Sequence, residues 1–91
     1  MKELFCVGDR VVVVCSNGGA TKAHIGRAGT VVHVPNGFDV GVEFDDAIYM
    51  GTTRIGHNCN GHCKQGFGRY CMPSELEFLQ SEATCSVEDL L

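Results

Sequence analysis

The residue types best suited to chemistry gather between His57 and Cys71, where fifteen residues contain three cysteines and two histidines. Thiolate and imidazole groups are the ligands that zinc prefers in structural sites. We therefore predict a zinc site with one imidazole and three thiolates, from His57, Cys59, Cys63 and Cys71, with His62 as an alternative to His57. The competing interpretation is that Cys63 and Cys71 are small buried residues and that Cys59 is a loop thiol.

A cysteine close to a histidine is also the arrangement of a thiol nucleophile and its general base, which Cys59 or Cys63 beside His57 or His62 would satisfy in outline. The same stretch contains no acidic residue to orient an imidazole. Its pattern also predicts no sharp turn between a strand and a helix, which is the kind of turn that would expose a nucleophilic thiol. We therefore expect a protein that is not an enzyme.

Acidic residues are unevenly distributed along this chain, whose formal net charge is −4. They are absent from residues 10–38 and from residues 47–73, although both segments contain lysine and arginine. The overall negative charge argues against nucleic acid as a partner, because nucleic-acid-binding domains normally present a basic face. Two acid-free segments instead predict a site for something anionic, unless the pattern reflects chance in a short sequence.

The hydrophobic pattern predicts five short strands and hence an all-β fold. A run of four valines marks the first strand, and the third alternates apolar with polar side chains, which predicts one buried face. An Asn-Gly pair predicts a tight turn before the third strand. The predicted strands are residues 9–15, 28–34, 38–44, 69–72 and 77–79, with a helical turn at 73–76 and two long loops at 16–27 and 45–67.

The two long loops are expected to lie side by side, because the first and third connections of an antiparallel meander leave the sheet at the same end. Their cations and open glycine backbone would then form one site for a phosphorylated small molecule or an acidic protein surface. Two tyrosines would supply a stacking surface. The alternative for each residue is a solvated charge or a core aromatic. The predicted ligand-binding residues are Lys22, His24, Arg27, Tyr49, Arg54, His62, Lys64, Arg69 and Tyr70.

Several short motifs resemble members of the SH3-like barrel group. Residues 8–11 with 26–31 are similar to the opening of KOW modules. Residues 72–79 are similar to the strand, 3₁₀ turn and last strand that close an SH3 domain. Residues 29–31 with 40–45 resemble CAP-Gly and Mib-Herc2 domains, although the CAP-Gly peptide-binding sequence Gly-Lys-Asn-Asp-Gly is absent.

Together these motifs span residues 8–79 and imply a small five-stranded SH3-like barrel that acts as a binding module. The KOW resemblance implies contact with RNA as one alternative. The Gly-Val-Glu-Phe-Asp strand at 41–45, combined with a His-x-Cys loop at 57–59, also resembles small uncharacterised bacteriophage proteins. That resemblance implies an inhibitor of a host system, for instance an anti-defence protein that sequesters a nucleotide. A zinc-stabilised structural adaptor is a further alternative.

The length predicts one domain, residues 1–80, followed by an acidic segment, residues 81–91, that forms a tail or a short helical turn. No apolar run is long enough to span a bilayer, so no membrane partner is expected. The first nine residues lack a signal peptide, which predicts a cytoplasmic protein with reduced thiols. The alternative for a chain with six cysteines is a secreted disulfide framework. An exposed edge strand would also permit a homo-oligomer.

Overall fold

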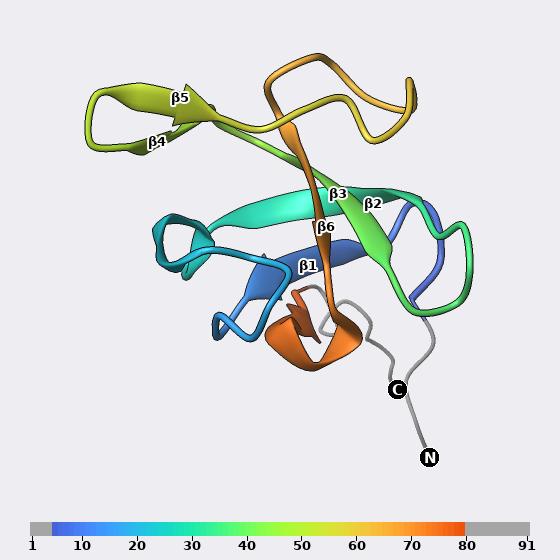
Figure 1. Cartoon of the computed structure of the whole chain (residues 1–91). Helices are drawn as coiled ribbons and strands as arrows, with labels where there is room; N and C mark the ends of the chain where they lie inside the picture. Colours follow the sequence, from blue (N-terminus) through green and yellow to red (C-terminus); the bar gives the residue numbers. More distant parts are fainter. Residues whose placement is uncertain (1–4, 80–91) are drawn as a thin grey trace, which may run out of the picture.

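The computed structural model of the chain describes residues 5–79, whose regular elements are strands and two short 3₁₀ helices (Figure 1). This confirms the predicted all-β fold. Among these residues, neither helix is long and apolar enough to cross a membrane. The tail or helical turn predicted for 81–91 lies outside the described residues. The elements are β1 (Arg10–Val13), η1 (Lys22–His24), β2 (Ala28–His33), β3 (Val40–Phe44), β4 (Ile48–Met50), β5 (Thr53–Ile55), β6 (Gly68–Cys71), η2 (Pro73–Glu75) and β7 (Leu76–Phe78).

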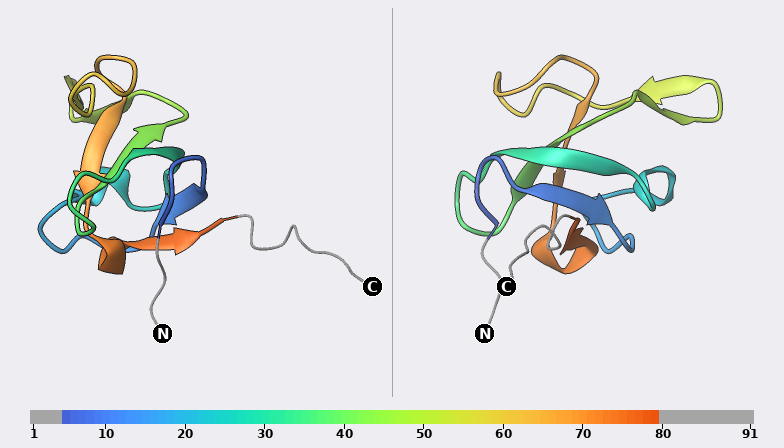
Figure 2. Two further views of the ribbon diagram at one scale, coloured as in Figure 1. Left: turned by 90° about the vertical axis from the view of Figure 1, so that its right-hand side faces the viewer. Right: turned by 180° about the vertical axis from the view of Figure 1, so that it is seen from behind.

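Five of the strands form one antiparallel sheet in the order β6-β3-β2-β1-β7. In this sheet β1 pairs with β2, β2 pairs with β3, and β3 pairs with β6. The last strand, β7, pairs with β1 on its other side. β6 and β7 are therefore the edge strands, and η2 connects them where the sheet curls round (Figure 2). Each of the five strands expected from the sequence overlaps one strand of this sheet.

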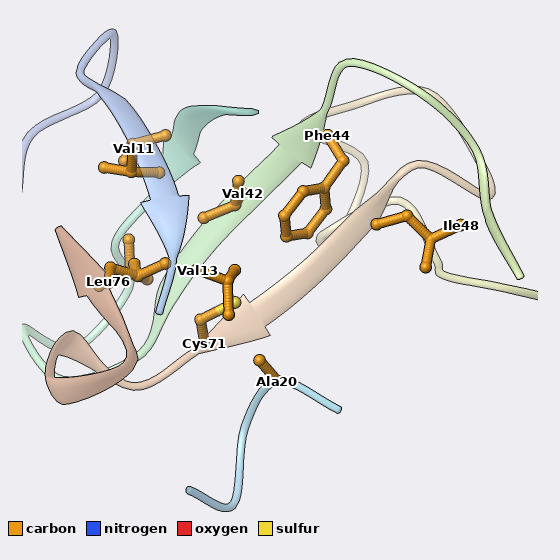
Figure 3. Close-up of a cluster of buried hydrophobic side chains, with 10 residues drawn as sticks. Val11, Val13, Ala20, Val42, Phe44, Ile48, Cys71 and Leu76 are labelled. Carbon is orange, nitrogen blue, oxygen red and sulfur yellow. The ribbon is translucent and has the colours of Figure 1, made fainter. Parts of the chain in front are cut away.

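Alternate valine side chains of β1 and β3 supply much of the core. Val11 and Val13 face inward from β1, and Val40 and Val42 face inward from β3. Because β-branched side chains pack well on a pleated surface, these short strands bury one face with few aromatic residues. The other buried core residues are Ala20, Val31, Phe44, Ile48, Cys71 and Leu76 (Figure 3).

The Asn-Gly turn before β3 forms as expected, but the strand begins two residues later than the sequence pattern indicated. The side chain of Asn36 accepts hydrogen bonds from the backbone N–H groups of Phe38 and Asp39, both at 2.9 Å. Gly37 has a φ of 79° within this turn. Phe38 therefore belongs to the turn rather than to the strand, and its side chain is 73% exposed.

A two-stranded hairpin lies within the segment expected to be a continuous loop. β4 and β5 pair through a two-residue turn at Gly51 and Thr52, where Gly51 has a φ of 67°. Ile48 of β4 enters the core, and β4 packs against η1. Each strand has three residues, which is too short to show an alternating pattern in the sequence.

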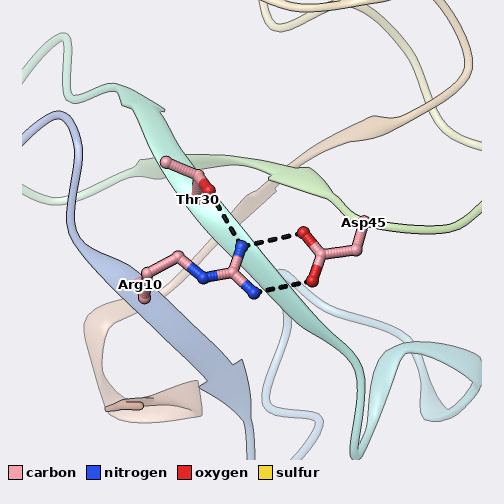
Figure 4. A network of polar contacts seen from close by, with 3 residues as sticks. All are labelled: Arg10, Thr30 and Asp45. Carbon is pink, nitrogen blue, oxygen red and sulfur yellow. Dashed lines mark hydrogen bonds and ion pairs between the residues drawn. The ribbon is translucent and has the colours of Figure 1, made fainter. Parts of the chain in front are cut away.

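A charged network fastens the start of β1 to the end of β3 (Figure 4). The guanidinium of Arg10 donates two hydrogen bonds to the Asp45 carboxylate, at 2.8 and 2.7 Å, and a third to Thr30 Oγ1 at 3.0 Å. The bonds from Arg10 hold the pKa of Asp45 below its usual value. Because the pair is partly exposed, we expect it to contribute no more than about 1 kcal/mol to stability.

His24 is the buried histidine of the fold, with 1% of its surface exposed. Its ring packs against Phe44, with the centroids 5.0 Å apart, and Nδ1 lies 2.8 Å from Thr21 Oγ1. Burial first, and then the positive charge of Arg69, lowers the pKa of His24 from 6.5 to about 4. Between these values the unfolded chain binds a proton that the folded chain excludes, so stability decreases as the pH falls.

We expect the free energy of unfolding to decrease by about 1–3 kcal/mol as the pH falls from 6.5 to 4. Urea denaturation at a series of pH values measures this loss. His24→Gln should remove most of the dependence, whereas His62→Gln, a change at an exposed ring, should retain it. An unchanged pH profile in His24→Gln would contradict the assignment.

Candidate ligand-binding site

A surface pocket of about 410 Å³ lies beside the edge strand β6. Its walls come from four separate parts of the chain: the loop after β1, the residue before β3, the loop before β6, and β6 with the residue that follows it. Arg69 and Tyr70 belong to the predicted ligand-binding set, and His57 belongs to the predicted metal set. The lining residues are Gly18, Gly19, Asp39, His57, Arg69, Tyr70 and Met72.

The carboxylate of Glu75 holds the first wall of this pocket in place. It is completely buried and accepts hydrogen bonds from the backbone N–H groups of Asn17, Gly19 and Ala20, and from Met72 at 2.7 Å. Burial alone would raise the pKa of Glu75, but these N–H groups together lower it below its usual value. Glu75 therefore remains ionised and fixes the loop after β1 against the end of β6.

Arg69 joins the same loop to β6 from the other direction. Its Nε donates a hydrogen bond to the backbone carbonyl of Gly19 at 2.8 Å. Gly19 has no room for a side chain, because a Cβ there would lie 2.7 Å from Glu75 Oε1 and 2.9 Å from the backbone nitrogen of Met72. The two terminal guanidinium nitrogens of Arg69 make no hydrogen bond or ion pair with residues 5–79, and Arg69 lines the pocket.

The outer edge of β6 is covered at one position and open at another. His57 and Gly68 exchange two backbone hydrogen bonds, both at 2.8 Å, so the N–H and C=O of Gly68 point away from β3. Backbone groups alternate sides along an antiparallel strand. Arg69 and Cys71 therefore pair with β3, and the N–H and C=O of Tyr70 point outward toward the pocket.

Aromatic rings connect the predicted residue His62 to this region. The hydroxyl of Tyr70 lies 2.7 Å from Nδ1 of His33, and the His33 ring stacks on His62 with a centroid separation of 3.8 Å. His57 stacks on Tyr70 at 5.6 Å. Burial, followed by the charge of Arg69, lowers the pKa of His57. His57 is therefore a neutral imidazole at the pocket near pH 7.

The three cysteines of the predicted zinc set occupy two different environments. A Cβ on Gly68 would lie 2.8 Å from Cys59 Sγ and 2.5 Å from Cys63 Sγ, so both sulfurs meet on the outer face of the sheet. Cys71 instead lies in the core. Burial raises the pKa of Cys59 and that of Cys71, each to about 12. Within residues 5–79, no three His, Cys, Asp or Glu side chains form a group that could hold a metal ion, and zinc stays a prediction.

The other predicted ligand-binding residues lie outside the pocket. His24 is buried and cannot contact a ligand at the surface, while Lys22 and Arg27 are exposed at the η1 end of the molecule. On the hairpin, Tyr49 of β4 is directly opposite Arg54 of β5. Arg54 and Lys64 both lie over the ring of Phe67, at 4.7 and 4.8 Å from its centroid.

The expectation that the two long loops lie side by side is confirmed for one part of them, since β4 packs against η1. The cations of the two segments do not converge on a single site. The hairpin stays beside η1, whereas the following loop crosses to the other end of β2, where His62 stacks on His33 (Figure 1).

Four pocket residues were missing from the predicted set: Gly18, Gly19, Asp39 and Met72. The consecutive glycines carried a usable signal, since adjacent glycines after a strand permit a close approach of backbone. Asp39 and Met72 carried none, because they reach the pocket only through the pairing of β3 with β6.

Comparison with known proteins identifies no relative: no protein-family model, no curated protein and no solved structure matches the chain. The geometry and chemistry of the pocket therefore carry the functional inference.

Replacing Glu75 by glutamine should destabilise the protein by about 1–3 kcal/mol, because the amide cannot accept all of the hydrogen bonds that converge on the carboxylate. The folded pKa of Glu75 lies below 4.5, so its contribution is complete above pH 4.5 and is lost as the pH falls further. Denaturation at pH 7 and at pH 3 measures both effects. Glu77→Gln, on the exposed side of β7, is the matched control. Equal stability of the two variants at pH 7 would disprove this role for Glu75.

Metal content decides the zinc prediction. The prediction requires that elemental analysis of the purified protein finds about one equivalent of zinc, and that the double change Cys59→Ser and Cys63→Ser abolishes it. Less than about a tenth of an equivalent in the unmodified protein removes the prediction.

Proposed function

We propose that this protein is a non-enzymatic binding module whose pocket beside β6 recognises an anionic group through Arg69. The observation that carries the proposal is that Arg69 has no carboxylate partner within residues 5–79. Within residues 5–79, the one ion pair joins Arg10 to Asp45, so the guanidinium of Arg69 lines the pocket with no carboxylate partner. A planar guanidinium fork matches a carboxylate or a phosphate.

The surroundings of Arg69 suit a small ligand. The pocket volume of about 410 Å³ falls within the range of sites that hold small molecules, roughly 300–1,000 Å³. The bond from Nε to Gly19 fixes the direction of the side chain, which lowers the entropic cost of binding. The ring of Tyr70 and the neutral imidazole of His57 provide a flat wall for a ring or for apolar atoms.

The thiols favour binding over catalysis. Burial raises the pKa of Cys63 as well as that of Cys59, and a protonated thiol is a poor nucleophile. All five cysteines in the described part of the chain are free. This supports a reducing compartment, which we propose to be the cytoplasm.

A second candidate is recognition of an acidic protein surface by the hairpin and the loop that follows it. The Phe67 ring holds Arg54 and Lys64 at the surface, and Tyr49 lies opposite Arg54. Such exposed cations act mainly at the rim of an interface, where they raise association rates more than affinity.

Variants of Arg69 test the pocket. Thermal-shift screening and calorimetry with inorganic phosphate, mononucleotides and acidic peptides should find a ligand that raises the melting temperature. Arg69→Gln should weaken its binding about ten- to a hundredfold, the range for a hydrogen-bonded charge. Arg54→Gln is the matched control outside the pocket, and it should bind like the unmodified protein. The second candidate predicts the reverse result, in which Arg54→Gln weakens binding and Arg69→Gln binds like the unmodified protein.

Circular dichroism and the melting temperature of Arg69→Gln establish that the loop and sheet remain folded, because this change also removes the bond to Gly19. A folded Arg69→Gln protein that binds normally would refute the role of this pocket, as would a screen in which no anion binds.

A further inference from the structure

We propose that the occupant of the pocket is an extended peptide segment with one carboxylate, which pairs with the backbone of Tyr70 as a short addition to the sheet. This inference rests on the proposed function, because the carboxylate is the group that Arg69 would bind. It adds the chemical class of the ligand and the backbone groups of β6 with which the ligand pairs.

The first support is the backbone geometry at the edge of the sheet. His57 already acts as a one-residue strand beside β6, because its N–H and its C=O both bond to Gly68. Because this bridge is antiparallel, the residue in register with Tyr70 is Ile55, and Ile55 instead pairs with Ile48 in the β4–β5 hairpin. Tyr70, two residues beyond Gly68, is left with an outward N–H and an outward C=O.

The open edge is short. One residue past β6, the backbone N–H of Met72 donates to Glu75, and that bond turns the chain into η2. A partner strand can therefore exchange backbone bonds with Tyr70 alone, which fits a segment of two or three residues rather than a long strand. Addition of an extended peptide to a sheet edge obtains its affinity from such backbone bonds and its specificity from flanking side chains.

The opposite wall leaves room for a main chain. Gly18 and Gly19 line the pocket without side chains, and Gly19 is held in place by Glu75 and Arg69. A peptide between this wall and Tyr70 would place an acidic side chain or a terminal carboxylate near the guanidinium of Arg69.

The charges in the pocket favour a single carboxylate over a nucleotide. Arg69 is the one arginine or lysine that lines the pocket, and the acidic residue Asp39 lines it as well. A di- or triphosphate would bring several negative charges toward one cation and one acid, and like charges at short range are unfavourable. One carboxylate balances one guanidinium, and Asp39 remains available to an amide or ammonium donor of the peptide.

The free protein provides the first test. Amide hydrogen exchange followed by NMR should find the Tyr70 amide exchanging much faster than those of Arg69 and Cys71, whose N–H groups pair with β3. Equal protection of the three amides would overturn the proposal. Protection of Tyr70 that grows with protein concentration would also overturn it, because a second copy of the chain would then occupy the edge.

The second test compares three peptides, of which the first is acetyl-Ala-Asp-Ala-amide. The second peptide has asparagine in place of aspartate. The third keeps the aspartate but is methylated at its central backbone nitrogen and at its last backbone nitrogen. The first should shift and protect the Tyr70 amide. The asparagine peptide should bind about ten- to a hundredfold more weakly, and the methylated peptide about two- to tenfold more weakly. Arg69→Gln should remove the preference for aspartate over asparagine.

Inorganic phosphate and adenosine monophosphate separate failure of this inference from failure of the proposed function. Binding of either one in an Arg69-dependent manner, with no binding of the aspartate peptide, would overturn the peptide inference and leave the anion pocket standing. Absence of binding by peptide, phosphate and nucleotide alike would overturn both.

Discussion

The buried carboxylate of Glu75 is the interaction on which the functional end of this molecule depends. It has no cationic partner within ion-pair distance among residues 5–79, and backbone N–H groups stabilise its charge instead. Those groups belong to the loop after β1 and to the junction of β6 with η2, which are far apart in the sequence. A buried charge is tolerated only when it is fully hydrogen-bonded. The loop therefore has one position in which Glu75 is satisfied, and that position forms a wall of the pocket.

Glycine allows close backbone approach on both sides of β6. On one side, Gly19 passes so near Glu75 and Met72 that no side chain would fit. On the other side, Gly41 and Gly68 leave the outer face of the sheet open to Cys59, which is completely buried there. The loop from His57 to Cys63 is thus packed onto the sheet, although it contains little regular structure. This packing leaves β6 half covered, and the uncovered half faces the pocket.

The distribution of cations follows from how the segment between β3 and β6 divides. Its first part forms the β4–β5 hairpin, which Ile48 anchors in the core beside η1. Its second part returns across the sheet to His33. Arg54 and Lys64 remain together because both lie over the Phe67 ring, whereas Arg69 is drawn to Gly19. The acid-free segment therefore places its cations in two separate regions, one at the Phe67 ring and one at Gly19.

The sequence by itself determined the five strands of the main sheet and the turn before β3, whereas it did not reveal the β4–β5 hairpin. The valines of β1, the alternation through β3 and the Asn36–Gly37 pair act over a few residues, so local pattern was sufficient to predict them. It also singled out Arg69, Tyr70 and His57, which do meet at one pocket. Only the tertiary structure decided that His24 is buried, that Cys71 is a core residue, and that Asp39 and the Gly18–Gly19 wall complete the pocket. The reason is that burial and strand pairing depend on contacts between residues distant in the chain, such as those from Glu75 to Ala20, and no local pattern encodes these.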